Sequence, residues 1–160
     1  MKIARITLSD RASSGVYEDR SGPEIERVLG GEFAGETIEW LRILIPDEQP
    51  QIEATLRRMC DQEDCLLVVT TGGTGPSPRD VTPEATRAVI QRELPGFGEV
   101  MRMQSFLKVP TAILSRSTAG TRGRSLIVNL PGNPRAIGEC LPLLVPAIRE
   151  AMRHLCEPAA

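Results

Sequence analysis

The residues of this 160-residue chain that are best suited to chemistry lie in the stretch TTGGTGPSPRD, residues 70–80. The stretch holds Gly72, Gly73 and Gly75, and it ends in Asp80. Because glycine has no Cβ atom, successive backbone N–H groups can surround a concavity that a ligand enters closely. A helix that begins after such a loop adds partial positive charge. The pattern favours a phosphate site over a simple tight turn, for which one glycine would suffice.

This loop differs from two familiar phosphate-binding loops. A P-loop has a lysine and then serine or threonine after its last glycine, and no lysine follows here. A dinucleotide-binding loop requires G-x-G-x-x-G, and Ser77 and Pro78 occupy the places where its last glycine would fall. The sequence therefore predicts a phosphate site of a different kind.

Two aspartates are expected beside the glycine loop. Asp47 follows the apolar segment 36–45, and Asp80 closes the glycine loop after the apolar segment 65–71. Since the carboxyl ends of parallel strands meet at one edge of a sheet, both carboxylates should face one site. Bound phosphates would be repelled unless a cation lay between them, and Mg²⁺ binds through one or two carboxylates together with phosphate oxygens and water. Asp47 alone is better explained as a turn or cap residue. The convergence of both aspartates with the glycine loop is what favours the metal role.

Expected strands and helices alternate along the chain and would position these loops. Strands are expected over residues 2–8, 36–45, 65–71 and 126–131, with a short strand or extended segment over 111–117. Helices are expected over residues 22–29, 51–60, 83–90, 95–109 and 137–155, and a turn over 119–125. This alternation predicts a single α/β domain, residues 1–160, with a mostly parallel sheet.

Glycine and proline mark expected helix ends. The helix over 22–29 should stop at Gly30 and Gly31. Pro142 and Pro146 fall inside the last helix, and each removes a backbone hydrogen bond, so a kink or a break is expected there.

Composition and charge exclude several classes of function. Aromatic residues make up 3% of the chain, the formal net charge is −2, and no basic run is present, so a nucleic-acid partner is not expected. The one histidine, His154, and four cysteines without a C-x-x-C pair argue against a zinc site. The polar N-terminus and the lack of any apolar run of roughly 20 residues lead us to expect a cytoplasmic protein without a membrane span.

Other candidate ligands lie in the loops that follow the expected strands. Ser9 and Asp10 end the first strand, where a turn role explains them about as well as ligand binding. Arg11, Arg79 and Arg116 could each meet a phosphate or a carbonyl group, although a single arginine is more often a solvated surface charge.

Taken together, six motifs resemble those of the molybdopterin adenylyltransferases, that is, the MogA-type enzymes and the related G domains of plant and animal molybdenum-cofactor proteins such as gephyrin. The motifs are TGGTGPSPRDVTPEAT, SDRASSGVYEDRSG, IPDEQ, PGFGEVMR, TAILSRSTAG and NLPGNPRAI. The resemblance runs from Ile3 to about Leu155, and the long glycine motif is its most specific part.

The resemblance implies a fold, a reaction and a set of site residues. The fold is a three-layer α/β/α sandwich assembled as a homotrimer. The reaction transfers AMP from ATP to molybdopterin with release of pyrophosphate, depends on Mg²⁺, and makes a product that a molybdate-insertion protein could receive. Asp47 and Asp80 are the implied catalytic and metal-binding residues. The implied substrate-binding residues are Gly72, Gly73, Thr74 and Gly75 of the glycine loop, Ser115, Arg116 and Ser117 of the pterin-binding LSRS segment, and Pro131, Gly132 and Asn133 of the PGNP loop.

Two alternatives remain open at this point. The first is a trimeric module of MoaB type that binds molybdopterin without adenylylating it, because the motifs do not separate the MogA and MoaB subgroups. The second is another nucleotide hydrolase or transferase on the same fold, as in the competence-damage-type proteins. Intact Asp47 and Asp80 favour the adenylyltransferase over the binding module.

Overall fold

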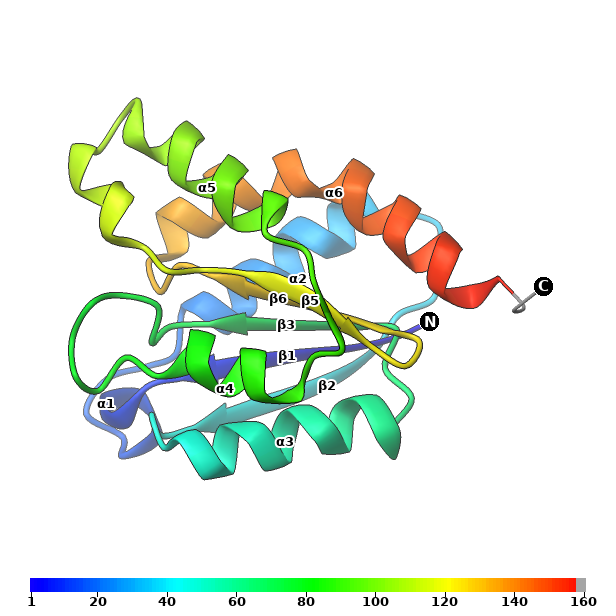
Figure 1. The fold of residues 1–160 in the computed structure, drawn as a ribbon, viewed down its shortest axis with the longest axis horizontal. Coiled ribbons are helices and arrows are strands. Elements are labelled where there is room, and N and C mark those ends of the chain that lie inside the picture. Colours follow the sequence, from blue (N-terminus) through cyan, green and yellow to red (C-terminus); the bar gives the residue numbers. More distant parts are fainter. Residues whose placement is uncertain (158–160) are drawn as a thin grey trace.

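A six-stranded sheet lies between two layers of helices in the computed structural model, which describes residues 1–157 (Figure 1). One face of the sheet is covered by α3 (Gln49–Asp61) and α4 (Thr82–Val89). The opposite face is covered by α2 (Ser21–Glu32), α5 (Gly96–Phe106) and α6 (Pro134–Cys156). The expected three-layer α/β/α sandwich is confirmed. No helix among the described residues is long and apolar enough to cross a membrane.

The sheet is parallel in the part from which the candidate loops emerge. Its strand order is β2-β1-β3-β6-β5-β4. The strands are β1 (Lys2–Leu8), β2 (Glu39–Ile45), β3 (Leu67–Thr71), β4 (Arg92–Glu93), β5 (Ala119–Arg122) and β6 (Ser125–Leu130). The first four strands in that order run parallel to one another. Beyond them, β5 pairs antiparallel with β6, and β4 pairs antiparallel with β5. The loops after β1, β2, β3 and β6 therefore all leave the sheet at the carboxyl ends of the parallel strands.

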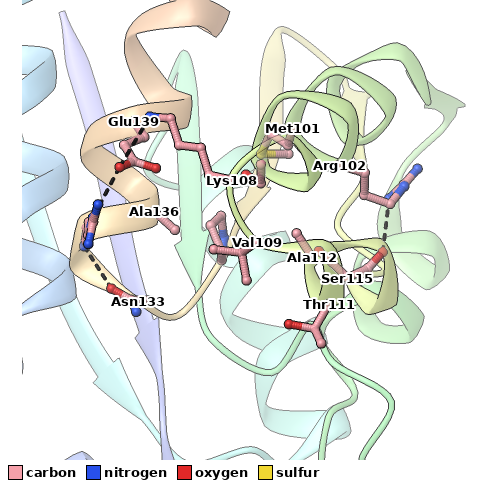
Figure 2. Close-up of a pocket in the computed structure, with 13 residues that line it drawn as sticks. Met101, Arg102, Lys108, Val109, Thr111, Ala112, Ser115, Asn133, Ala136 and Glu139 are labelled. Atoms are coloured by element: carbon pink, nitrogen blue, oxygen red, sulfur yellow. Dashed lines mark hydrogen bonds and ion pairs between the residues drawn. The ribbon is translucent and has the colours of Figure 1, made fainter.

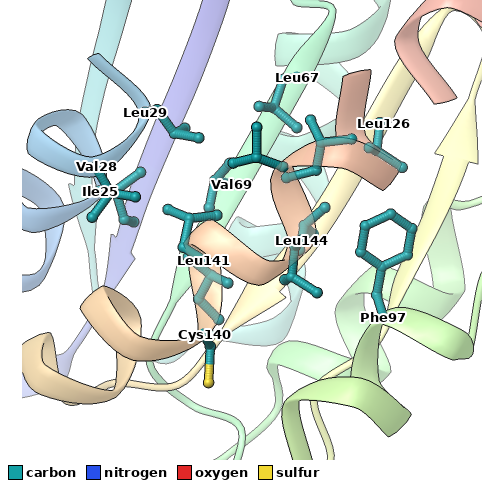
Figure 3. Packing of buried hydrophobic residues seen from close by; sticks show 14 of the residues in the cluster. Ile25, Val28, Leu29, Leu67, Val69, Phe97, Leu126, Cys140, Leu141 and Leu144 are labelled. Carbon is teal, nitrogen blue, oxygen red and sulfur yellow. The ribbon is translucent and has the colours of Figure 1, made fainter. Parts of the chain in front are cut away.

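Two apolar clusters, one on each face of the sheet, form the core. The larger cluster joins α2, α5 and α6 to the sheet, and Figure 3 shows Leu29, Val69 and Leu141 among its side chains. The smaller cluster joins α3 and α4 to the other face through residues such as Leu56 and Val68. Because β3 contributes to both clusters, all of its side chains are buried, which explains the continuous apolar run in the sequence.

Two helices continue through residues where the sequence predicted a stop or, for the last helix, a kink or a break. Helix α2 runs through Gly30 and Gly31 to Glu32, because packing of its apolar side against α6 outweighs a helix-propensity cost of about 1 kcal/mol per glycine. Helix α6 continues through Pro142 and Pro146 without a break. Both prolines lie on its less buried side, where a carbonyl group that loses its helical partner can be solvated.

The segment between α5 and β6 also differs from the sequence prediction. Residues Pro110–Leu114 form a 3₁₀ helix, η1, where a strand or extended segment was expected. Residues 115–118 have no regular secondary structure, and β5 then occupies part of the predicted turn. The turn itself is confined to the β5–β6 hairpin, where Gly123 has a φ of 54°. A short helix, α1 (Asp10–Ser13), likewise lies within the predicted polar loop after β1.

Two helix glycines give a matched test of packing. A Cβ atom on Gly98 of α5 would lie 2.1 Å from the carbonyl oxygen of Ser117, whereas a Cβ atom on Gly30 of α2 would meet nothing within 4 Å. We expect Gly98→Ala to lower the free energy of unfolding by about 1–3 kcal/mol through overpacking. Gly30→Ala should raise it by about 0.5–1 kcal/mol through improved helix propensity. Urea denaturation of both variants measures these changes, and effects of the same sign would contradict the contact described for Gly98.

Candidate functional site

A cavity of about 220 Å³ opens at the carboxyl ends of β1, β3 and β6. Five residues that the sequence singled out line it, namely Ser9, Asp47, Gly72, Gly73 and Gly132. They come from the loops after four parallel strands, as the topology requires. The expected convergence of Asp47 and the glycine loop is therefore observed.

The glycine loop can take its conformation only because side chains are absent. Gly72 and Gly73 have φ values of 96° and 63°, in the left-handed region that favours glycine. A Cβ atom on Gly72 would lie 2.2 Å from the carbonyl oxygen of Leu8, at the end of β1. The Thr82 hydroxyl donates to the Gly72 carbonyl oxygen at 2.8 Å, and the Thr82 N–H donates to the Gly73 carbonyl oxygen at 3.1 Å. The start of α4 thus holds the loop against the cavity.

The carboxylate of Asp47 is held on one side and unpaired on the other. Its Oδ2 accepts a hydrogen bond from the Asp10 N–H at 3.0 Å, while the Asp47 N–H donates to Asp10 Oδ1 at 3.0 Å. Its Oδ1 is buried and has no hydrogen-bond partner within residues 1–157. A Cβ atom on Gly73 would lie 2.9 Å from that oxygen. Burial raises the pKa of Asp47, and the negative charges of Asp10 and Asp80 raise it further.

Asp80 lies close enough to Asp47 to influence its ionisation, and it also shapes its own loop. Asp80 Oδ2 accepts a hydrogen bond from the Ser77 N–H at 3.0 Å. The same oxygen would lie 2.8 Å from a Cβ atom on Gly75. A cap role and a ligand role are compatible here, because a carboxylate has further lone pairs.

Asp10 and Arg79 connect the loops around the cavity. Arg79 donates to Asp10 through Nε at 3.0 Å and Nη2 at 2.9 Å, and it also pairs with Glu48 at 2.9 Å. Hydrogen bonds from Arg79, and a further one from the Asp47 N–H, hold the pKa of Asp10 below its usual range. Both Asp10 oxygens are thus engaged by the protein. Ser9 caps α1 by accepting from the Ala12 N–H at 3.1 Å.

The loop after α1 is anchored by a half-buried charge cluster. Asp19, which lines the 220 Å³ cavity, accepts from Arg5 and from the Thr7 hydroxyl, each at 2.9 Å. Arg5 also donates to Glu26 of α2 at 2.9 Å. Asp19 therefore fixes one wall of the cavity, a role that its place in a polar stretch did not reveal.

A second cavity, of about 470 Å³, lies between α5, η1 and the start of α6 (Figure 2). It is lined by Ser115, Pro131 and Asn133, which the sequence had singled out. Gly132 lines the first cavity, so the PGNP loop borders both. Asn133 also caps α6, because its Oδ1 accepts from the Arg135 N–H at 2.9 Å.

Basic residues that sequence reasoning missed line the larger cavity. They are Arg102, Lys108 and Arg135, from three separate segments. Lys108 and Arg135 both pair with Glu139, at 3.4 Å and 3.2 Å. Nothing in their spacing marks them, since only the fold brings them together.

Six sequence-predicted residues line neither cavity, namely Asp10, Thr74, Gly75, Asp80, Arg116 and Ser117. Thr74 is buried, and its carbonyl oxygen accepts from the Arg116 N–H at 2.8 Å. Ser117 is buried, and its hydroxyl accepts from the Ser115 hydroxyl at 3.1 Å. The Arg116 guanidinium donates to Gly75, Asp80 and Glu84.

The described residues fit a divalent cation only if a ligand completes its coordination. Among residues 1–157 there is no group of three or more His, Cys, Asp or Glu side chains that could hold a metal. Asp47 offers a buried, unpaired oxygen, with Asp80 nearby. Mg²⁺ suits such a site, because it commonly keeps waters and binds substrate phosphates beside one or two carboxylates.

Comparison with known proteins places the chain in a family. A family described as "Probable molybdopterin binding domain" matches residues 4–150. The Helicobacter pylori (strain J99) molybdopterin adenylyltransferase is 56% identical over 146 residues, covering 91% of this chain and 82% of that protein. The Escherichia coli (strain K12) protein of the same name is 52% identical over 141 residues, covering 88% and 72%.

A solved structure supports the same assignment. The molybdopterin biosynthesis enzyme MoaB from Thermus thermophilus superimposes with a TM-score of 0.86 at 42% identity, covering 96% of this chain and 95% of that one. Both the matched motifs and the fold extend over nearly the whole chain. This protein therefore belongs to the molybdopterin-binding domain family of molybdenum-cofactor biosynthesis.

Proposed function

We propose that this protein is a molybdopterin adenylyltransferase, a single-domain nucleotidyltransferase that moves AMP from ATP to the terminal phosphate of molybdopterin and releases pyrophosphate. The names of its relatives support the reaction class. The observation that carries the proposal is the unpaired Asp47 Oδ1, which lies beside the glycine loop in the 220 Å³ cavity. A buried carboxylate oxygen without a donor is suited to a cation that arrives with a phosphate ligand.

The proposed chemistry needs no protein base. The terminal phosphate of molybdopterin is ionised at neutral pH and can attack the α-phosphorus of ATP directly. The barrier then comes mainly from bringing two anions together, so positioning and charge neutralisation dominate. Backbone N–H groups of Gly72 and Gly73 are suited to stabilise phosphate oxygens. Asp47 and Asp80 would hold Mg²⁺, which supplies positive charge to the triphosphate when bound.

The two cavities provide separate places for the two substrates. We assign the triphosphate to the smaller cavity, because Asp47 and the glycine loop line it. We assign molybdopterin to the larger cavity, where Lys108 and Arg135 offer positive charge. Both cavities border the PGNP loop, which would be the place where the reacting phosphates meet.

We propose that the protein is a homotrimer that contacts its copies through α5 and η1. Large apolar side chains are exposed along this surface, which we call the α5–η1 surface. They are Val100, Met103, Phe106, Leu107, Val109, Ile113 and Leu114, with Leu143 of α6 beside them. A cluster of this kind on a soluble protein marks an interface. Three copies are proposed from the family resemblance.

Use of ATP favours a cytoplasmic location. An adenylylated pterin is an activated intermediate, so we also propose transfer of the product to a molybdate-insertion protein.

The reaction is tested directly by incubating the protein with molybdopterin and Mg-ATP. We expect mass spectrometry to detect adenylylated molybdopterin together with an equal amount of pyrophosphate. Pterin binding without pyrophosphate release would support the binding module instead. ATP hydrolysis without any pterin would support a different nucleotide hydrolase.

Removing the Asp80 carboxylate should separate binding from turnover. We expect Asp80→Ala to lower kcat by at least about 10²–10³, the usual loss for one electrostatic contributor. Molybdopterin affinity should be retained, because Asp80 does not line the larger cavity. Asp61→Ala is the control, since Asp61 pairs with Arg122 away from both cavities. Equal loss of turnover and pterin affinity in Asp80→Ala would identify Asp80 as a structural cap only.

Asp47→Asn should lose the Mg²⁺-dependent part of ATP affinity, because the amide removes the charge that would hold the cation. Calorimetric titration with ATP, with and without Mg²⁺, measures this affinity. Wild-type binding that is equally strong under both conditions would argue against the metal role.

The same substitution should change the pH dependence of stability. The pKa of Asp47 is raised in the folded state above 3.8, so ionisation costs the folded state more than the unfolded state. As pH rises above that value, wild-type stability should fall relative to Asp47→Asn, and the two should be closest at acidic pH. Denaturation of both proteins across this pH range measures the gap. A constant gap would contradict the raised pKa.

Charge on the α5–η1 surface should weaken self-association. Met103 is 69% exposed, so Met103→Asp should leave the fold intact and reduce the oligomer mass seen by light scattering. Val16→Asp is the matched control, because Val16 is 64% exposed on another surface. Unchanged trimers of Met103→Asp would place the interface elsewhere.

A further inference from the structure

Arg116 connects the segment before β5, residues 115–118, to two parts of the glycine loop. Its N–H donates to the Thr74 carbonyl oxygen at 2.8 Å. Its Nε donates to the Gly75 carbonyl oxygen at 2.9 Å, and its Nη2 donates to the Asp80 carbonyl oxygen at 2.7 Å. One residue therefore holds three carbonyl groups of the same loop.

An ion pair with Glu84 orients the Arg116 guanidinium. Glu84 lies in the first turn of α4, directly after the glycine loop, and its carboxylate accepts from Arg116. Burial acts to raise the pKa of Glu84, but the hydrogen bond and positive charge of Arg116 help to bring that pKa below its usual range. Because the guanidinium is planar and its donors point in fixed directions, these contacts set the distance between Gly75 and Asp80.

The segment that carries Arg116 is itself fixed to the wall of the larger cavity. Arg102 of α5 donates to the carbonyl oxygens of Ser115 and Ser117 at 3.3 Å and 2.9 Å. Ser115 lines the larger cavity, and Figure 2 shows it beside Arg102. A continuous set of contacts thus runs from the larger cavity through Arg116 to the glycine loop.

We propose that Arg116 is a positioning residue, which sets the glycine loop and the Asp80 backbone for phosphate transfer without contacting either substrate. Its polar contacts are with loop carbonyl groups and Glu84, and it lines neither cavity. Its catalytic importance rests on the proposed adenylyl transfer, whereas its effect on the loop does not.

The test compares Arg116→Ala and Arg116→Lys with Arg87→Ala. Arg87 is a matched control, because it is a partly exposed arginine on α4 that pairs with Glu93 and makes no contact with a loop carbonyl. Three quantities are measured for each protein: hydrogen exchange of the loop, affinity for molybdopterin, and kcat and KM for Mg-ATP. The informative amides are those of Ser77, Asp80 and Thr82, which donate hydrogen bonds within the loop or at its junction with α4.

We expect Arg116→Ala to speed exchange of these amides roughly tenfold or more, while exchange in β1 and β3 stays unchanged. Molybdopterin affinity should stay within about twofold of wild type, and kcat should fall roughly 10–100-fold, because the loop amides are no longer preorganised. Arg116→Lys should recover little of this loss, since one ammonium group cannot span Gly75 and Asp80. Arg87→Ala should match wild type.

Two results would overturn the proposal. Weaker molybdopterin binding with normal loop exchange would make Arg116 a substrate ligand. Faster exchange throughout β1 and β3 would make it a general stability residue. If the wild-type protein forms no adenylylated product, the proposed function fails, but loop exchange and pterin affinity still decide the role of Arg116.

Discussion

The site depends on a carboxylate that the fold buries and then leaves half unpaired. Asp10 and Asp47 exchange backbone-to-carboxylate hydrogen bonds, and this pairing points Asp47 Oδ1 toward Gly73 with no donor among the described residues. Leaving a buried polar atom unpaired costs about 1–3 kcal/mol, and more for a charged one. Such a cost is understandable where a cation and a phosphate complete the coordination. The raised pKa of Asp47 is a consequence of the same burial.

The surrounding structure keeps this arrangement in place through backbone contacts. Thr82 holds one part of the glycine loop, and Arg116 holds the other through its carbonyl groups. Arg79 ties the tip of the loop to Asp10 and Glu48. A loop of small residues has few apolar contacts of its own, so its conformation is fixed by polar side chains from neighbouring elements. A rigid loop of this kind keeps its backbone N–H groups preorganised, as electrostatic stabilisation of a transition state requires.

The larger cavity and the α5–η1 surface follow from the way in which α5 is placed. Helix α5 packs its buried side against the large core cluster through Phe97 and Met101, and it leaves Met103 and Leu107 exposed. Its Arg102 donates to the segment before β5, at the Ser117 carbonyl oxygen, and helps to line the larger cavity. One helix thus takes part in the core, in a cavity wall and in the apolar surface.

The sequence alone determined the strand–helix alternation and the convergence of Asp47 with the glycine loop, and it predicted a phosphate site there. The alternation and the glycine spacing are local patterns that can be read without knowing distant contacts, and the convergence follows from the rule that the carboxyl ends of parallel strands meet at one edge of a sheet. Tertiary structure alone decided that α2 and α6 pass through glycine and proline, since packing outweighs propensity there. It alone brought Lys108 and Arg135 to one cavity and placed Arg116 on the loop carbonyls. Contacts between side chains far apart in the chain leave no spacing signal, so only the folded geometry could reveal them.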